Sequence, residues 1–151
     1  MARILKVALA GAALVALVVP SGASAVQGAA EFFARGNGLN GVSCAIYDGY
    51  GGGPVALCSY VTRKTQAKAT LRPNGSVVLC RTHKITSNRC GLGNVGEGAK
   101  TYGVGKTVTV GRFACTIQSG GVRCVLSASG KGFIFGTKQL RAVGGATVTR
   151  R

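Results

Sequence analysis

Few residues in this chain are suited to acid–base chemistry. Its 151 residues include one histidine, His83, and three carboxylates, Glu31, Asp48 and Glu97, against 19 Lys and Arg. A Ser-His-Asp triad would depend on His83 and Asp48 without a G-x-S-x-G nucleophile motif, and a glycosidase carboxylate pair is equally poorly supplied. We therefore expect a non-catalytic protein, with a small extracellular hydrolase as an alternative.

One glycine motif, at 91–96, matches the G-x-G-x-x-G spacing of dinucleotide-binding loops. Such a motif functions where it links a strand to the N-terminus of a helix. Here Cys90 precedes the motif, and Gly103 and Gly105 disfavour a helix after it. Paired zinc ligands at short spacing are also missing, because no two cysteines have fewer than eight residues between them. We expect no cofactor and no metal ion.

The first 25 residues have the composition of a secretory signal peptide. Arg3 and Lys6 precede an uncharged apolar stretch at 7–19, and Ala23-Ser24-Ala25 supplies an Ala-x-Ala cleavage site. The apolar stretch is shorter than the roughly 20 residues that a membrane-spanning helix needs. We expect cleavage after Ala25 and secretion of a mature chain without a membrane span. That chain keeps 17 of the 19 basic residues and all three acidic ones.

All six cysteines lie in the mature chain, and an even number in an exported chain of this size predicts a disulfide framework. Hairpin geometry indicates one pairing directly. A two-residue turn at Ser119-Gly120 places Cys115 opposite Cys124, in a non-hydrogen-bonded pair with Cα atoms about 4.5 Å apart. That separation is within disulfide reach. The same register keeps the apolar residues of both strands on one face.

A second hairpin is predicted at Asn74-Gly75, because this dipeptide favours a two-residue type I′ turn. Its register places Ala69 opposite Cys80, so a local bridge from Cys80 to Cys90 is the simplest choice. The remaining pair would close a glycine-rich loop at 48–54. The expected pairings are Cys115–Cys124, Cys80–Cys90 and Cys44–Cys58.

Apolar or alternating runs bounded by Gly, Asn or Pro indicate strands, and the mature chain lacks the sustained 3.6-residue periodicity of a helix. Regular turn spacing predicts an all-β fold, a small antiparallel sandwich or barrel of hairpins stapled by three disulfides. No linker or internal repeat is visible, so 26–151 should form one domain. The expected strands are 42–47, 55–61, 66–72, 76–81, 106–117, 121–127, 132–136 and 140–143.

The C-terminal part of the chain carries a family resemblance. The residues concerned are Tyr102-Gly103, the Val-Gly-Arg-Phe-Ala-Cys of 110–115, the Gly-Val-Arg-Cys of 121–124 and the Gly-Lys-Gly-Phe of 130–133. This succession resembles that of a family of small exported actinobacterial proteins of unknown function, closely over 101–143 and loosely over 33–44. The chain departs from the commoner pattern in having Lys131 where His is frequent, no Trp, and Cys90 downstream of Cys80. The resemblance implies export and a six-cysteine fold, with no known activity.

Positive charge is the remaining signal. Between Asp48 and Glu97 the chain has seven basic residues and no acidic one. In the predicted Asn74-Gly75 register, Lys68 lies opposite Arg81, and like charges so placed destabilise a sheet unless an anion or salt screens them. We expect this hairpin to bind an anionic cell-envelope polymer, an acidic polysaccharide or extracellular nucleic acid. The candidate binding residues are Lys68, Arg72 and Arg81, which would share a face, together with Arg63 and Lys64.

Other interpretations of the charge stay open. A basic surface that only keeps a secreted protein soluble is one, and an interaction or inhibitor protein with a protein partner is another. The nine Tyr and Phe residues offer no stacking platform, which argues against sequence-specific nucleic-acid binding. The lack of a cationic amphipathic helix argues against helical membrane disruption.

Overall fold

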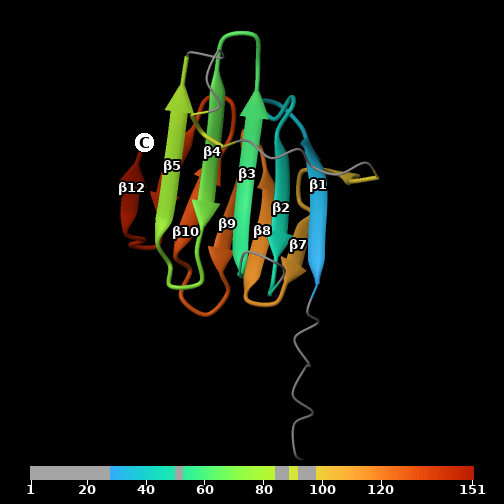
Figure 1. Ribbon diagram of the computed structural model, residues 1–151. Helices are drawn as coiled ribbons and strands as arrows, with labels where there is room; N and C mark the ends of the chain where they lie inside the picture. The colour runs from blue at the N-terminus through green and yellow to red at the C-terminus, as the bar shows by residue number, and fades with distance from the viewer. Residues whose placement is uncertain (1–27, 50–52, 84–88, 92–97) are drawn as a thin grey trace, which may run out of the picture.

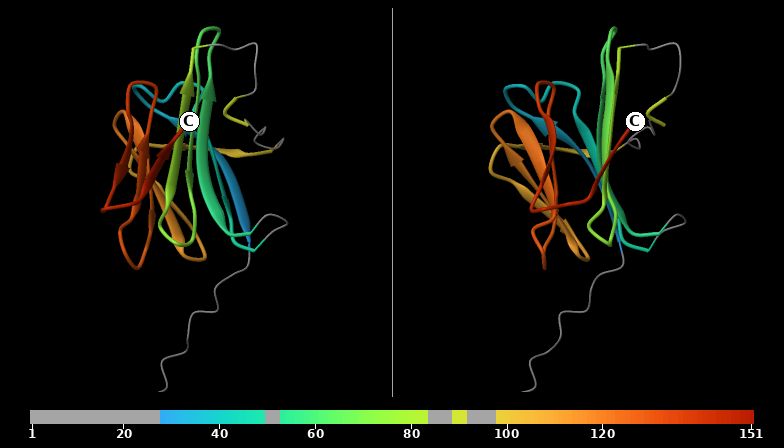
Figure 2. Two further views of the ribbon diagram at one scale, coloured as in Figure 1. Left: turned by 60° about the vertical axis from the view of Figure 1, so that its left-hand side comes forward. Right: turned by 90° about the vertical axis from the view of Figure 1, so that its left-hand side faces the viewer.

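The computed structural model describes residues 28–49, 53–83, 89–91 and 98–151. These residues form two β-sheets that pack face to face, with no helix among them. Figure 1 looks onto one sheet, and Figure 2 shows the two layers edge-on. The predicted all-β fold is therefore confirmed, as a sandwich. The expected signal peptide at 1–25 and most of the glycine motif at 91–96 lie outside the described residues.

The larger sheet, sheet A, is mostly antiparallel. Its strands are β1 (Ala29–Arg35), β2 (Ser43–Tyr47), β3 (Val55–Val61), β4 (Gln66–Leu71), β5 (Val77–Thr82), β6 (Lys100–Gly103) and β12 (Val148–Arg150). The first five form a meander in sequence order. At the two edges, β6 runs parallel to β1 and β12 runs parallel to β5. The end of the described chain consequently lies beside β5 (Figure 1).

The smaller sheet, sheet B, is a single antiparallel meander. Its strands are β7 (Thr107–Val110), β8 (Phe113–Gln118), β9 (Gly121–Leu126), β10 (Gly132–Phe135) and β11 (Leu140–Val143). The inner faces of the two sheets form one core, in which Phe32 of sheet A and Phe113, Phe133 and Phe135 of sheet B are fully buried. The Tyr60 ring lies 5.6 Å from that of Phe135, a tilted aromatic contact between the sheets.

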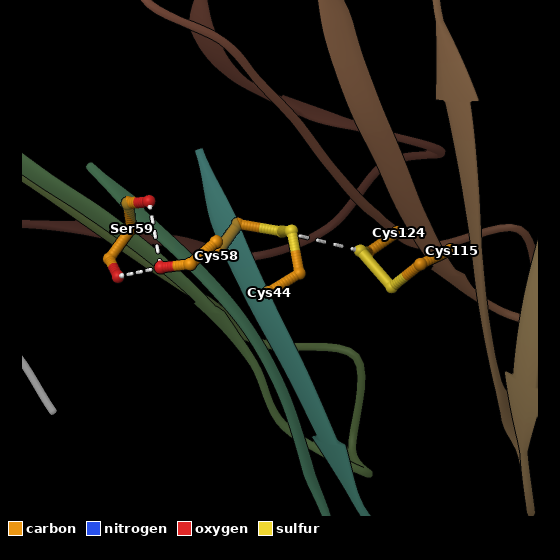
Figure 3. The surroundings of a disulfide bond; sticks show 6 residues. Cys44, Cys58, Ser59, Cys115 and Cys124 are labelled. Atoms are coloured by element: carbon orange, nitrogen blue, oxygen red, sulfur yellow. Dashed lines mark hydrogen bonds between the residues drawn. A yellow bond between two sulfur atoms is a disulfide. The ribbon is translucent and has the colours of Figure 1, made fainter. Parts of the chain in front are cut away.

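Two disulfides meet in the middle of this core. Cys44–Cys58 joins β2 to β3 and Cys115–Cys124 joins β8 to β9, and in both pairs the cysteines are direct cross-strand partners. Their Cα atoms are 4.1 and 4.0 Å apart, which matches non-hydrogen-bonded pairs. Cys58 Sγ lies 3.8 Å from Cys124 Sγ (Figure 3). Because both sulfurs are oxidised and carry no hydrogen, this is a van der Waals contact between the sheets.

The three pairings predicted from the sequence are the three in the structure, since Cys80 is bonded to Cys90. The predicted register of β8 and β9 is also confirmed. Three strands were missed: β1, and the parallel edge strands β6 and β12. The expected strand at 106–117 is instead two strands separated by a turn at Gly111, where φ is +54°. A β-carbon at Gly111 would overlap the Asp48 carboxylate, and the left-handed conformation favours glycine, so a larger residue here would be strained and would displace the Asp48 side chain.

The predicted register of β4 and β5 is wrong by one residue. Lys68 lies opposite Cys80 rather than Arg81, and Ala69 lies opposite Leu79 rather than Cys80. The reason is Pro73, which would have to donate a backbone N–H to close a two-residue turn at Asn74-Gly75 and has none.

The chain forms a three-residue turn instead. Arg72 N donates to Ser76 O at 2.9 Å, and Gly75 N donates to Arg72 O at 3.0 Å. Pro73 then occupies the first central position of a type I turn, where its fixed φ is favourable and no N–H is needed. Gly75 follows with φ +81°, the left-handed conformation that closes such a hairpin.

Removal of a core disulfide should destabilise the sandwich strongly. For the Cys115→Ala/Cys124→Ala variant we expect the free energy of unfolding to fall by more than about 3 kcal/mol, the value that loop entropy alone predicts for a loop of this size. The additional loss comes from the cavity left between the two sheets. Urea unfolding of the variant and the wild type measures it. A loss below about 1 kcal/mol would show that the two sheets do not depend on this contact.

Candidate functional site

The candidate site lies on the outer face of sheet A, which is turned away from sheet B. Along β4, Ala69 and Leu71 are buried in the core, so the alternate residues Lys68 and Thr70 point outward. On β5, the direct partner of Lys68 is Cys80, which therefore also belongs to the outer face. In the observed register Cys80 therefore lies on the outer face beside Lys68, whereas the predicted register placed it on the core face opposite Ala69.

A hollow of about 300 Å³ opens on this face, over β4, β5 and the residue after β12. Thr70, Val78, Gly91 and the Cys80–Cys90 disulfide supply its neutral lining, and none of the lining residues that the structure describes has an acidic side chain. We call this feature the basic hollow, and the basic residues in its described lining are Lys68, Arg72, Arg89 and Arg151.

Lys68 is the most enclosed of these cations. Its side chain is half-buried, and its Nζ donates a 2.6 Å hydrogen bond to the carbonyl oxygen of Gly91. Burial lowers the pKa of Lys68 below its ordinary value, because the ammonium loses contact with water. The ammonium has three donors, and the acceptor of its hydrogen bond is a neutral carbonyl rather than a carboxylate. The environment of Lys68 therefore favours an anion as an additional partner.

Arg89 is brought to the hollow by the third disulfide. Cys80–Cys90 ties the segment 89–91 to β5, and the Lys68 bond to Gly91 ties the same segment to β4. Figure 2 shows this segment on the side of sheet A that faces away from sheet B. Cys80 and Cys90 are 6% and 8% exposed, whereas the four core cysteines are fully buried. This disulfide thus forms a wall of the hollow and lies outside the core.

Of the five predicted binding residues, two line the hollow, namely Lys68 and Arg72. The expectation that Arg81 shares their face is wrong, because Arg81 is the partner of Ala67 and belongs to the opposite face at the end of β5. Arg63 and Lys64 lie in the exposed turn between β3 and β4 and are not among the lining residues.

Sequence reasoning missed two members of the hollow, Arg89 and Arg151. The position of Arg89 could have been predicted from the sequence. Arg89 precedes Cys90, and the disulfide partner of Cys90, Cys80, lies on the outer face in the correct register. The position of Arg151 could not, because it depends on the parallel pairing of β12 with β5. Parallel pairing joins distant segments without a hairpin signal in the sequence.

The acid–base candidates lie elsewhere. His83 is exposed after the end of β5, where its Nδ1 lies 3.1 Å from Thr65 Oγ1. Asp48 follows β2 beside the start of β3, at the opposite end of sheet A, so the two do not form a triad. Among the described residues, no group of three His, Cys, Asp or Glu side chains is arranged to hold a metal ion.

Glu31 accepts a hydrogen bond from the Tyr47 hydroxyl on the outer face, where β1 pairs with β2. This places the carboxylate on the β1–β2 side of sheet A, away from the basic hollow on β4 and β5. Burial, the hydrogen bond and the charge of Glu31 together raise the pKa of Tyr47 to about 12. The Glu31 carboxylate is therefore engaged with a tyrosine.

A second hollow, of about 600 Å³, lies at the end of the sandwich where the β4–β5 turn meets turns of sheet B. Arg112 and Lys131 line it together with Asp48 and apolar residues such as Leu126. Because its carboxylate offsets part of its positive charge, this hollow is less suited than the basic hollow to an anionic ligand.

The Tyr47–Glu31 pair should be visible in an alkaline titration. An unfolded tyrosine ionises near pH 10, whereas folded Tyr47 stays protonated until about 12. Its contribution to stability is complete below pH 10 and is lost as the pH rises through 12. Tyrosinate absorbance should show a late ionisation that Tyr47→Phe removes and Glu31→Gln shifts to lower pH. Identical titrations of wild type and Tyr47→Phe above pH 11 would contradict this account.

Removal of the Cys80–Cys90 disulfide should release the 89–91 segment from sheet A without unfolding the sandwich. In the Cys80→Ala/Cys90→Ala variant we expect the sandwich to persist, because both core disulfides remain, with a stability loss of at most about 3 kcal/mol. Backbone ¹⁵N order parameters should fall at Arg89 and Gly91 and stay unchanged at core positions of sheet B. Equal order parameters of the 89–91 segment in variant and wild type would show that the disulfide does not position it.

Comparisons with known proteins add no assignment. No family model, no curated protein and no solved structure matches this chain. Within the described ranges, no helix is long and apolar enough to cross a membrane. Three disulfides are consistent with an extracellular protein.

Proposed function

We propose that this protein is a secreted, non-catalytic binding protein that holds anionic polymers of the cell envelope or its surroundings on the outer face of sheet A. The observation that carries the proposal is the basic hollow, where Lys68, Arg72, Arg89 and Arg151 converge and no acidic side chain is found among the described lining residues. Cations gathered in this way repel one another unless anions neutralise them. A bound polyanion would relieve that repulsion and release its own counterions.

Export is part of the proposal. The signal peptide expected at 1–25, with cleavage after Ala25, would deliver the chain to an oxidising compartment where its disulfides form. The resemblance to small exported actinobacterial proteins agrees with this route. Anionic envelope polymers and acidic polysaccharides are ligands that such a protein would meet. The hollow recognises charge rather than base edges, so sequence-specific nucleic-acid binding is not proposed.

Two triple variants with equal charge test the proposal. The site variant is Lys68→Ala/Arg72→Ala/Arg89→Ala, and the control variant is Arg63→Ala/Lys64→Ala/Arg81→Ala. Both lose three positive charges, but only the first changes the hollow. Binding to polyphosphate and to dextran sulfate is measured by fluorescence titration at several salt concentrations.

We expect the site variant to bind at least about tenfold more weakly at low salt. Its slope of log K against log salt should fall by about two, because each contact with a flexible polyanion contributes about 0.7. The control should stay within about threefold of wild type. Equal losses in both variants would mean that net charge alone binds the polymer, and no loss in either would overturn the proposal.

A further inference from the structure

The basic hollow is small compared with the polymers it is proposed to hold. Its volume of about 300 Å³ corresponds to roughly ten water molecules at about 30 Å³ each. One anionic group with a short substituent fits in such a space. A larger ligand would also contact the surrounding surface.

The donors in the hollow exceed what one carboxylate uses. A guanidinium presents a planar fork that pairs with two oxygen atoms, and Arg72, Arg89 and Arg151 supply three such forks. A carboxylate has two oxygens and one negative charge. A terminal phosphate has three free oxygens and a charge of about −1.5 to −2 at neutral pH. The phosphate therefore matches the donors of three guanidinium groups and one ammonium better than a carboxylate does, in both its number of oxygens and its charge.

Two further groups in the hollow fit a phosphate. Lys68 keeps donors beyond the one it gives to Gly91 O, and an ammonium binds phosphate as a compact charge. The Thr70 hydroxyl, between Lys68 and Arg72 along β4, adds a neutral donor on the same lining. Within the described part of the lining, no side chain is an acid that would repel a dianion.

We infer that the basic hollow is a binding site for a terminal phosphate group, of the phosphomonoester or pyrophosphate class, held by Lys68, Arg72, Arg89 and Arg151. This inference rests on the proposed function and names the ligand chemistry of the same site. The group could end a phosphate-containing polymer or belong to a free diphosphate, and the chemistry of recognition is the same. A polymer whose charges are all carboxylates would contact the surrounding surface without filling the hollow.

Calorimetric titration with inorganic pyrophosphate tests the inference, with citrate as a polycarboxylate control at equal ionic strength and without divalent metals. We expect pyrophosphate to bind at least about tenfold more tightly than citrate. Arg72→Lys keeps the charge and removes the fork, and should weaken pyrophosphate binding about tenfold. Arg63→Lys, in the exposed β3–β4 turn, is the matched control and should leave it unchanged.

A short phosphodiester oligomer, with and without its terminal phosphomonoester, distinguishes the two sources. Binding that is lost with the terminal phosphate assigns the site to polymer ends, and binding of pyrophosphate alone assigns it to free diphosphates. Both results uphold the phosphate assignment.

Two other results would overturn the phosphate assignment and differ in what they leave standing. If citrate binds as tightly as pyrophosphate while the hollow variant still loses polymer binding, the phosphate inference fails and the proposed function stands. If the hollow variant binds both pyrophosphate and polymers like wild type, both fail. Circular dichroism of each variant confirms that it is folded.

Discussion

The contact between the Cys44–Cys58 and Cys115–Cys124 disulfides joins the centres of the two sheets. Each disulfide fixes the register of its own strand pair, because it links residues that are direct cross-strand partners. The 3.8 Å separation of Cys58 and Cys124 sulfurs then places one fixed pair against the other. A domain of this size has a modest core, and covalent links at its centre compensate for that. The outer face of sheet A takes no part in holding the two sheets together.

That division explains how the third disulfide can serve the site. Cys80 and Cys90 lie on the outer side of sheet A, away from the core between the sheets, where their bond holds Arg89 near Lys68 over β4 and β5. Like charges held so close are unfavourable in the free protein, and the rigid sandwich beneath them keeps them together. The cost is recovered when an anion binds, which is how a preorganised site gains affinity. The fold thus holds the cations of the basic hollow close together, and an anionic ligand binds because it relieves their mutual repulsion.

Local geometry made much of this structure predictable. Cys115 and Cys124 could be paired because a two-residue turn and an apolar face agree on one register. Lys68 and Arg72 were identified because they alternate along a predicted strand. The assignment of Arg81 failed at a single residue, Pro73, whose missing N–H changes the turn and moves Arg81 to the other face. Arg151 depended on the parallel pairing of β12 with β5, which no local pattern encodes.

The most direct test of the account is a map of where an anionic ligand binds. In a ¹⁵N–¹H correlation spectrum titrated with polyphosphate, we expect the largest shifts at Lys68, Thr70, Arg72, Val78, Cys80, residues 89–91 and Arg151. Sheet B and the β3–β4 turn, with Arg63 and Lys64, should change little. Shifts spread over all basic residues, or concentrated on sheet B, would contradict the claim that the basic hollow is the binding site.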